Sequence, residues 1–323
     1  MNLLIIGTGS PIPPTGWGAV EAIIHEHVQR IPKFGHTVDL INTQDWWSLT
    51  EKTKSNNKKY DFIHCHYDIM WPFMKVLSCD YKVGMSSHFP YIGKEEIYDN
   101  FGYWKVMKYF QENLNNNYNF CISNKDKEYF ISKGCDSSKI FRMFVGAPES
   151  ISFEKQAKYP DKTLYLGKIC QRKRQEKYGH FDFIDFVGNI SDEDINANPN
   201  NLKHYLGEWT KEEVHTKTTH YANLCLLSQG EDTPLVIREA LIAGCGIVCS
   251  KTSSEELEDL PFISIIPDEK LDDFNYIENI IKENQKKSIE MREDIRNYGI
   301  NKFGWDKCTE KYLKEVEKVV QNF

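Results

Sequence analysis

Residues 228–250 read SQGEDTPLVIREALIAGCGIVCS, and this stretch decides the fold class. Its pattern predicts the end of one strand, a polar loop, a helix and then a second buried strand. Thr233 and Pro234 supply an N-cap followed by a proline at the first helical position, and Gly244 supplies the stop. A strand, a helix and a strand joined so closely are typical of an α/β sheet.

The helix within this stretch is almost entirely apolar. Between residues 235 and 243 only Arg238 and Glu239 are polar, so we expect a buried helix whose carboxylate has a partner. Glu239, about two turns into the helix, is placed to accept hydrogen bonds from a ribose diol. Alternatively, Glu239 pairs with a structural cation and Glu231 is a solvated loop residue. The start of the helix is a candidate binding site, because its free backbone N–H groups favour a phosphate or a sugar hydroxyl. Its residues are Thr233, Pro234, Leu235 and Val236.

The same alternation extends over the chain. Apolar runs predict strands at 3–6, 37–41, 62–64, 82–86, 119–123, 163–166, 181–187, 204–206, 222–227, 247–250 and 262–266. Helical spacing or capping signals are found at 20–31, 125–133, 210–213 and 305–320. A polar segment between Pro148 and Pro160 indicates a linker. We therefore expect two Rossmann-like, doubly wound α/β domains facing each other across a cleft, with residues 1–155 in the first and 156–304 in the second.

Composition excludes several classes of protein. The chain has 323 residues, 40% of them hydrophobic and 27% charged, which suits two soluble globular domains. No apolar run could cross a bilayer, and the N-terminus lacks the basic region of a secretory signal. We expect a cytoplasmic protein with no integral membrane segment, and peripheral contact with a membrane stays open.

Charge and cysteine content exclude further classes. Residues 1–150 contain 16 lysines and arginines and 16 acidic residues. Residues 151–323 contain 24 lysines and arginines and 31 acidic residues, so the net charge of −7 comes from this second half. This balance gives no support to nucleic-acid binding. Nine cysteines without a CxxC pair indicate reduced core thiols rather than a disulfide framework or a zinc ribbon.

Glycine and histidine motifs follow strands of the first half. Gly16, Trp17 and Gly18 allow a ligand to approach the backbone, although a plain turn in a proline-rich loop is the alternative. The earlier glycines at 7 and 9 make a poor dinucleotide fingerprint, because prolines stand where its helix should start. His64 and His66 share one face of a strand, but the spacing offers no third ligand for a metal.

Several segments together resemble the retaining glycosyltransferases of family 4. Glu231 and Glu239, followed by the rest of EALIAGCGIV, resemble their nucleotide-sugar signature. The segments IPPTGWGAVE (12–21), LGKICQRK (166–173), YLGEW (205–209) and FGWDKCTEKYLKEV (303–316) resemble, in this order, the glycine loop, the phosphate-binding segment, the strand before the base pocket and the terminal helix. The resemblance covers essentially the whole chain. It implies the GT-B fold, with a terminal helix at 305–323 that packs back on the first domain.

The resemblance also implies an activity, the transfer of a hexose-type sugar from a nucleotide-diphosphate sugar such as a UDP- or GDP-sugar. The acceptor would be a glycan, a lipid or another small molecule, configuration would be retained, and no metal or other cofactor would take part. Lys168 and Lys173 would neutralise the departing diphosphate, Glu231 would bind the donor sugar and Glu239 the ribose. Gly16, Trp17 and Gly18 would line the donor phosphates, and His88 would lie near the reacting sugar.

Some features depart from this pattern or leave alternatives. The family usually has arginine where Lys168 stands, and an Asn-Gly pair where residues 145–147 read VGA. A solvated basic turn is the alternative for the two lysines, and Arg172 and Arg174 are expected at the surface. The acidic string at 192–194 resembles a metal motif of another fold but reads as an exposed loop. A GT-B epimerase and a non-catalytic nucleotide-sugar-binding protein remain alternative functions.

Overall fold

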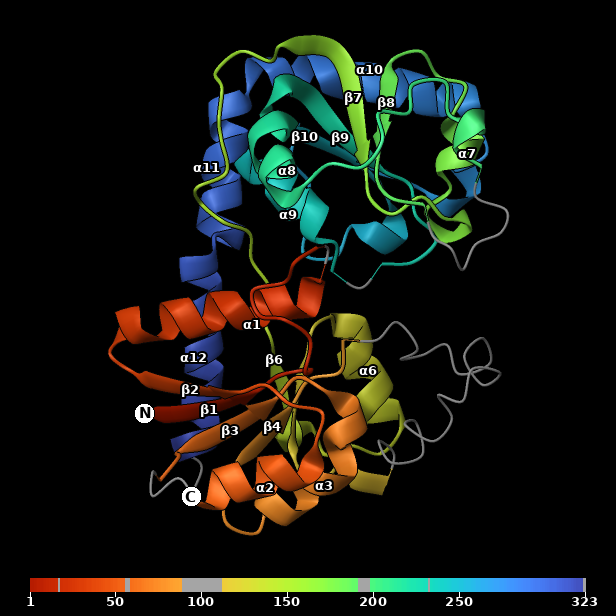
Figure 1. The fold of residues 1–323 in the computed structure, drawn as a ribbon. Coiled ribbons are helices and arrows are strands. Elements are labelled where there is room, and N and C mark those ends of the chain that lie inside the picture. Colours follow the sequence, from red (N-terminus) through yellow and green to blue (C-terminus); the bar gives the residue numbers. More distant parts are fainter. Residues whose placement is uncertain (17, 56–58, 89–111, 191–197, 232, 322–323) are drawn as a thin grey trace. The chain divides into compact units, whose positions relative to one another are not determined.

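The computed structural model describes residues 1–16, 18–55, 59–88, 112–190, 198–231 and 233–321. The chain divides into two compact units, drawn in Figure 1. Unit 1 comprises Met1–Val145 and Trp305–Phe323, and unit 2 comprises Gly146–Gly304. Each unit has its own parallel sheet and its own hydrophobic core.

Unit 1 contains a six-stranded sheet in the order β2-β1-β3-β4-β5-β6, in which all neighbours are parallel. Its strands are β1 (Asn2–Ile6), β2 (Thr37–Ile41), β3 (Phe62–Cys65), β4 (Val83–Met85), β5 (Tyr118–Cys121) and β6 (Ile140–Arg142). Its described helices are α1 (Ala19–Arg30), α2 (Trp46–Ser55), α3 (Trp71–Leu77), α6 (Asn124–Ser132) and α12 (Trp305–Gln321), with 3-10 turns η1 (Ile31–Phe34), η2 (Asp68–Met70) and η4 (Ser137–Lys139). Strands are added on one side of β1 and then on the other, so the topological switch point lies between β1 and β3.

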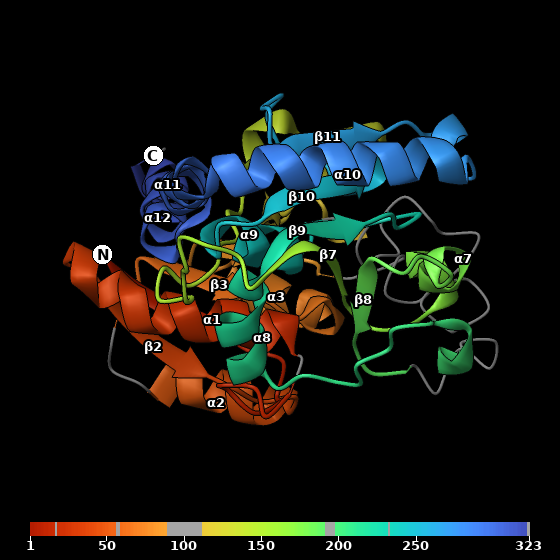
Figure 2. The ribbon, with the colours of Figure 1, turned by 90° about the horizontal axis from the view of Figure 1, so that it is seen from above.

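Unit 2 contains a five-stranded parallel sheet in the order β11-β10-β9-β7-β8. Its strands are β7 (Tyr159–Leu166), β8 (Ile184–Val187), β9 (Tyr221–Leu226), β10 (Gly246–Ser250) and β11 (Ile263–Ile266). Its described helices are α7 (Gln175–Tyr178), α8 (Lys211–Lys217), α9 (Leu235–Ile242), α10 (Phe274–Glu290) and α11 (Arg292–Phe303), with 3-10 turns η5 (Gln171–Lys173), η6 (Pro199–Asn201), η7 (Thr218–His220), η8 (Lys251–Ser253) and η9 (Asp268–Lys270). Figure 2 shows α10 running along β10 and β11. The switch point of this sheet lies between β7 and β9.

The central strands are mostly apolar because helices cover both faces of a parallel sheet. Every residue of β9 and β10 is buried, and so are four of the five residues of β1. The last helix, α12, buries the stripe formed by Leu313, Val316 and Val319 and belongs to unit 1. The expectation of two doubly wound α/β domains is confirmed.

Some local expectations are corrected. The run 204–206 is not a strand, since only Tyr205 bridges to β8 before Gly207 turns the chain with a φ of +80°. The short strand β6 was not expected. Helix α9 begins one residue later than the cap signal indicated, with Pro234 at the N-cap. The expected boundary after residue 155 differs from the observed one, because Ile151 is buried in the core of unit 2.

The described residues contain no helix that is both long enough and apolar enough to cross a membrane. All nine cysteines are free, as expected. Seven of them are buried, whereas Cys79 is exposed and Cys170 is partly exposed.

Candidate functional site

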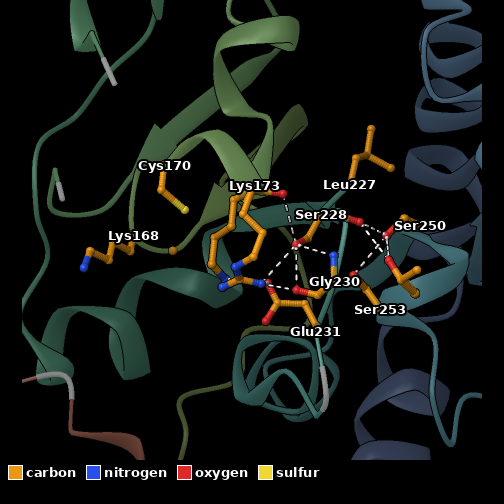
Figure 3. Close-up of polar contacts among 12 residues, drawn as sticks. Lys168, Cys170, Lys173, Leu227, Ser228, Gly230, Glu231, Ser250 and Ser253 are labelled. Atoms are coloured by element: carbon orange, nitrogen blue, oxygen red, sulfur yellow. Dashed lines mark hydrogen bonds and ion pairs between the residues drawn. The ribbon is translucent and has the colours of Figure 1, made fainter. Parts of the chain in front are cut away.

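Sequence-predicted residues of unit 2 meet at the carboxyl ends of β7 and β9. Lys173 lies in the turn after β7, and Glu231 lies in the loop after β9. The Nζ atom of Lys173 is 2.9 Å from Oε1 of Glu231, and Figure 3 labels both residues. A guanidinium nitrogen of Arg172 is 3.0 Å from the same oxygen. Doubly wound sheets bind their ligands at such a switch point, beyond the carboxyl ends of the strands. The cluster therefore occupies the expected place for a ligand site.

A buried tyrosine fixes the two loops against each other. The hydroxyl of Tyr165 donates to the carbonyl of Lys173 and accepts from the N–H of Leu227 at 2.9 Å. Gly167 has a φ of +150°, and a Cβ atom there would stand 3.2 Å from Nζ of Lys173. The turn after β7 therefore requires glycine, both for its conformation and to admit the lysine side chain.

Hydroxyl groups anchor the loop that carries Glu231. The carbonyl of Ser228 accepts from the hydroxyls of Ser250 at 2.6 Å and Thr252 at 2.9 Å. The hydroxyl of Ser228 accepts from the N–H of Gly230 at 3.3 Å, as Figure 3 shows. The loop is thus held by β10 and the turn after it, so Glu231 has a defined position before any ligand arrives.

The electrostatics of Glu231 are those of a buried ion pair. Its side chain is only 12% exposed, so the alternative of a solvated loop residue is wrong. Burial alone would raise the pKa of Glu231, but the charges of Lys173 and Arg172 outweigh burial and lower it. The carboxylate is therefore ionised at neutral pH, and the cluster carries one anion against two cations.

The other basic residues of this segment, Lys168, Arg172 and Arg174, differ in their surroundings. Lys168 is exposed, and Figure 3 shows its side chain extending away from Lys173 and Glu231. The expectation of a surface position is wrong for Arg174, whereas the side chain of Arg172 is 40% exposed. Arg174 is 7% exposed and donates to Asp272 at 2.6 Å, while Arg172 joins the Glu231 cluster. The run of three basic residues at 172–174 gives no sign of which side chains turn inward.

Glu239 forms a second charged cluster, between α9 and α8. Its side chain is 4% exposed and forms an ion pair with Lys211, and Nε2 of His215 lies 3.6 Å from the same oxygen. Burial would raise the pKa of Glu239, but Lys211 and His215 together lower it to about 2. The alternative, in which Glu239 pairs with a structural cation, thus describes the observed contact with Lys211. Thr210 and Glu213 form the expected capping box that starts α8.

Lys211 and His215 could not be predicted from the sequence. They stand four residues apart, so they share one face of α8, but nothing in the sequence says that this face meets Glu239. The start of α9, from Thr233 to Val236, is half-buried.

The glycine loop of unit 1 follows β1. Neither Gly16 nor Gly18 has a positive φ. The space around Gly16 is open, whereas a Cβ atom on Gly18 would lie 2.6 Å from the carboxylate of Glu21 and 3.0 Å from Pro14. Any larger residue at position 18 would have to displace the Glu21 side chain and would press on Pro14, whereas the open space at position 16 leaves the backbone accessible. Trp17 lies outside the described residues.

Four histidines cluster where β3 ends. The rings of His64 and His66 are 4.3 Å apart, which confirms that they share a face, and Nδ1 of His66 is 3.0 Å from Nε2 of His88. His27 lies 6.4 Å from His66 between ring centroids. Burial lowers the pKa to about 3 for His27, to about 4 for His88 and well below the usual value for the other two. All four are therefore neutral at pH 7.

Within the described ranges, no three histidine, cysteine, aspartate or glutamate side chains are arranged to hold a metal ion. The acidic string at 192–194 lies outside those ranges.

Comparisons with known proteins find the architecture but little shared sequence. Sucrose-phosphate synthase from Thermosynechococcus elongatus superposes with a TM-score of 0.78 over 100% of both chains, at 12% identity. Anabaena HepE in complex with UDP-glucose gives 0.70 over 98% of this chain and 99% of the other, also at 12% identity. The lipopolysaccharide outer core galactosyltransferase WaaB gives 0.67 over 98% and 99%, at 14% identity.

The chain has the GT-B fold. No model of a protein family matches the sequence, and a search of curated proteins finds no match. At 12 to 14% identity, the likeness to these GT-B proteins is one of fold.

Proposed function

We propose that this GT-B chain is a retaining glycosyltransferase of the family 4 type. It would move a hexose-type sugar from a nucleotide-diphosphate sugar to a glycan, a lipid or another small acceptor, without a metal. The observation that carries the proposal is the ion-pair cluster of Lys173, Arg172 and Glu231 at the switch point of unit 2. HepE, a protein of similar fold, has been crystallised with UDP-glucose.

The cluster suits the charge changes of glycosyl transfer. The bond between the anomeric carbon and the diphosphate oxygen breaks, and the negative charge that develops on the leaving group is stabilised by fixed cations. Lys173 and Arg172 are such cations, and both are held in place by their ion pairs with Glu231. When phosphate takes its place beside the cations, Glu231 becomes available to bind hydroxyls of the donor sugar. A phosphate oxygen then receives the proton of the attacking acceptor hydroxyl.

The remaining residues keep the roles that the resemblance implies. Glu239 would exchange Lys211 for the ribose hydroxyls of the nucleotide, and the backbone at the start of α9 would bind sugar and phosphate. Lys168, exposed in this structure, would supply a further cation to the diphosphate. On the acceptor side, the backbone at Gly16 would approach the donor phosphates and His88 would bind the reacting sugar.

Product analysis tests the activity. The protein is incubated with a panel of UDP- and GDP-sugars, with and without glycan and lipid acceptors, and free nucleoside diphosphate is measured. Release that depends on an acceptor supports transfer. Isomerised donor sugar would instead indicate an epimerase, and thermal stabilisation by a donor without turnover would indicate a binding protein.

Single substitutions test the site. We expect Glu239→Ala to weaken donor binding by about tenfold, because the ribose hydroxyls lose a charged acceptor. Lys173→Ala should mainly lower turnover, because the leaving group loses a cation that matters most in the transition state. Glu212→Ala, which removes an exposed carboxylate of α8, is the matched control. Unchanged kinetics in both site variants would remove the assignment.

A further inference from the structure

The direction of the hydrogen bonds of His64 in unit 1 can be derived from one serine. The hydroxyl of Ser86 has a single proton, and the carbonyl of Phe120 at 2.9 Å is a stronger acceptor than the sulfur of Met143 at 3.2 Å. Nε2 of His64, 3.0 Å from the same hydroxyl, must therefore donate to it. Nδ1 of His64 then accepts from the hydroxyl of Tyr312 at 2.8 Å.

The next histidine along the strand presents a different choice. His66 and His88 are joined through Nδ1 of the first and Nε2 of the second, and one of the two nitrogens carries the proton. Nε2 of His66 is buried and has no hydrogen-bond partner among the described residues. A proton on that nitrogen would leave a buried N–H group without an acceptor, which is costly and rare, whereas a bare lone pair is better tolerated. The proton therefore belongs on Nδ1 of His66.

This assignment determines the form of His88. Its Nε2 accepts the hydrogen bond from His66, so the single proton of the neutral ring lies on Nδ1. We propose that His66 is a positioning residue that holds His88 as the Nδ1–H tautomer, so that His88 offers the sugar a hydrogen-bond donor and not a base. The proposal rests on the proposed function and refines it. The matching ligand atom is an oxygen with a free lone pair, such as a hydroxyl oxygen of the donor sugar.

The packing holds the pair in this geometry. The backbone N–H of His66 donates to the carbonyl of Ile6 at 3.0 Å, which ties the residue to the end of β1 at the switch point of unit 1. Its ring lies 4.3 Å from that of His64 and 5.3 Å from that of His88, the latter nearly parallel at 20°. The ring of His66 thus has neighbours on two sides, and rotation would break its only observed side-chain hydrogen bond within the described residues.

Nuclear magnetic resonance tests the tautomers without any assay of activity. In the full chain labelled with ¹⁵N-histidine, long-range proton–nitrogen correlations distinguish Nδ1–H from Nε2–H rings, and single substitutions assign the signals. We expect His66 and His88 as Nδ1–H and His64 as Nε2–H. A proton on Nε2 of His88 would overturn the proposal whether or not the chain transfers sugar.

Kinetics of two His66 variants test the consequence for catalysis. His66→Leu removes the donor, and we expect kcat to fall by about tenfold with little change in KM, since His88 loses its preferred tautomer. His66→Asn places an amide N–H near the position of Nδ1 and should recover most of that loss. Equal loss in both variants, or full activity in His66→Leu, would overturn the role of His66.

A control separates this role from general packing. Tyr312→Phe disturbs the far end of the same cluster and should leave kcat unchanged. If the wild-type chain releases no nucleoside diphosphate from any donor, the proposed function fails. The resonance experiment then decides by itself whether His66 sets the tautomer of His88.

Discussion

Each unit carries a cluster of buried polar groups at its switch point, but the two clusters are built from opposite chemistry. In unit 1, neutral imidazoles such as His64 and His66 lie where β3 ends beside β1. In unit 2, the ion pair of Lys173 and Glu231 lies where β7 and β9 end. Both positions are switch points of doubly wound sheets. The fold thus dictates where the polar groups gather, while the side chains decide which ligands they suit.

The difference has a physical consequence for ligand binding. A buried carboxylate held by cations can be replaced by another anion, so the unit 2 cluster is suited to a phosphate that competes with Glu231. Neutral imidazoles offer one donor and one acceptor each and hold no net charge. Unit 1 therefore provides directed hydrogen bonds, and unit 2 provides charge.

The largest expected effect is acid sensitivity confined to unit 1. An unfolded histidine has a pKa of about 6.5, and burial lowers the pKa of His27, His64 and His66 in the folded chain. Below about pH 6.5 the unfolded state therefore binds more protons than the folded state. The free energy of unfolding has its full value above this pH and falls as the pH drops. At about 1.4 kcal/mol per histidine and pH unit, we expect a loss of about 4 kcal/mol from about pH 6 to 5.

Unit 2 should lose stability only in stronger acid. The pKa values of Glu231 and Glu239 are lowered, so their stabilisation persists down to about pH 4.5 and is lost below it. Hydrogen exchange followed by mass spectrometry, with rates corrected for pH, can compare peptides from β1 and β3 with peptides from β9 and β10. Equal loss of protection in the two sets of peptides at about pH 5 would contradict the comparison.

Sequence patterns were sufficient for the architecture and insufficient for side-chain partners. The apolar runs predicted β1, β9 and β10 because strands that are covered on both faces consist mainly of hydrophobic residues. The capping box at Thr210 and the stop at Gly244 depend on residues close in sequence, and both were predicted. The short strand β6 was not, because three residues show no period.

The charged partners were missed for a related reason. Glu239 was expected to need a partner, but Lys211 is distant in sequence and reaches it only through the packing of α8 on α9. Arg174 turns inward because its own φ of +59° redirects the chain. Likewise, the tautomer of His88 depends on its hydrogen bond to His66, 22 residues away in the sequence, which no local pattern encodes.

The second largest effect concerns the two cations of unit 2. The side chain of Lys173 is 12% exposed and that of Arg172 is 40% exposed. We expect Lys173→Met to lower the free energy of unfolding by about 3 kcal/mol, because it leaves a buried carboxylate with one cation. Arg172→Met should cost about 1 kcal/mol, because water screens the exposed arginine. Urea unfolding of the full chain measures both.

A double variant checks the cause. Adding Glu231→Gln to Lys173→Met removes the uncompensated charge and should recover part of the lost stability. Equal costs for the two single variants, or no recovery in the double variant, would argue against a buried ion pair at this position.

The third prediction compares one tyrosine from each unit. Tyr165→Phe leaves a carbonyl and the N–H of Leu227 without their partner, and we expect a cost of about 2 kcal/mol. Tyr312→Phe leaves only the Nδ1 lone pair of His64 without a donor. The cost should be about 1 kcal/mol, because a buried acceptor without a partner is better tolerated than a buried donor. Thermal unfolding of the two variants measures the difference. A larger cost for Tyr312→Phe would contradict the direction assigned to the hydrogen bond between Tyr312 and His64.

The smallest expected effects come from the two capping boxes. Ser123 starts α6 in unit 1 and is fully buried, whereas Thr210 starts α8 in unit 2 and is exposed. Ser123→Ala should cost about 1.5 kcal/mol, because a buried N–H loses its acceptor, and Thr210→Ala about 0.5 kcal/mol, because water replaces the hydroxyl.

Thr210→Ala should have a further effect that Ser123→Ala lacks. The first turn of α8 also carries Lys211, the cation that faces Glu239, so fraying there should weaken this ion pair. Carbon-13 resonance of Glu239 would then show its pKa rising from about 2 toward the ordinary value. An unchanged Glu239 titration in Thr210→Ala would mean that the packing of α8, and not its cap, holds Lys211 in place.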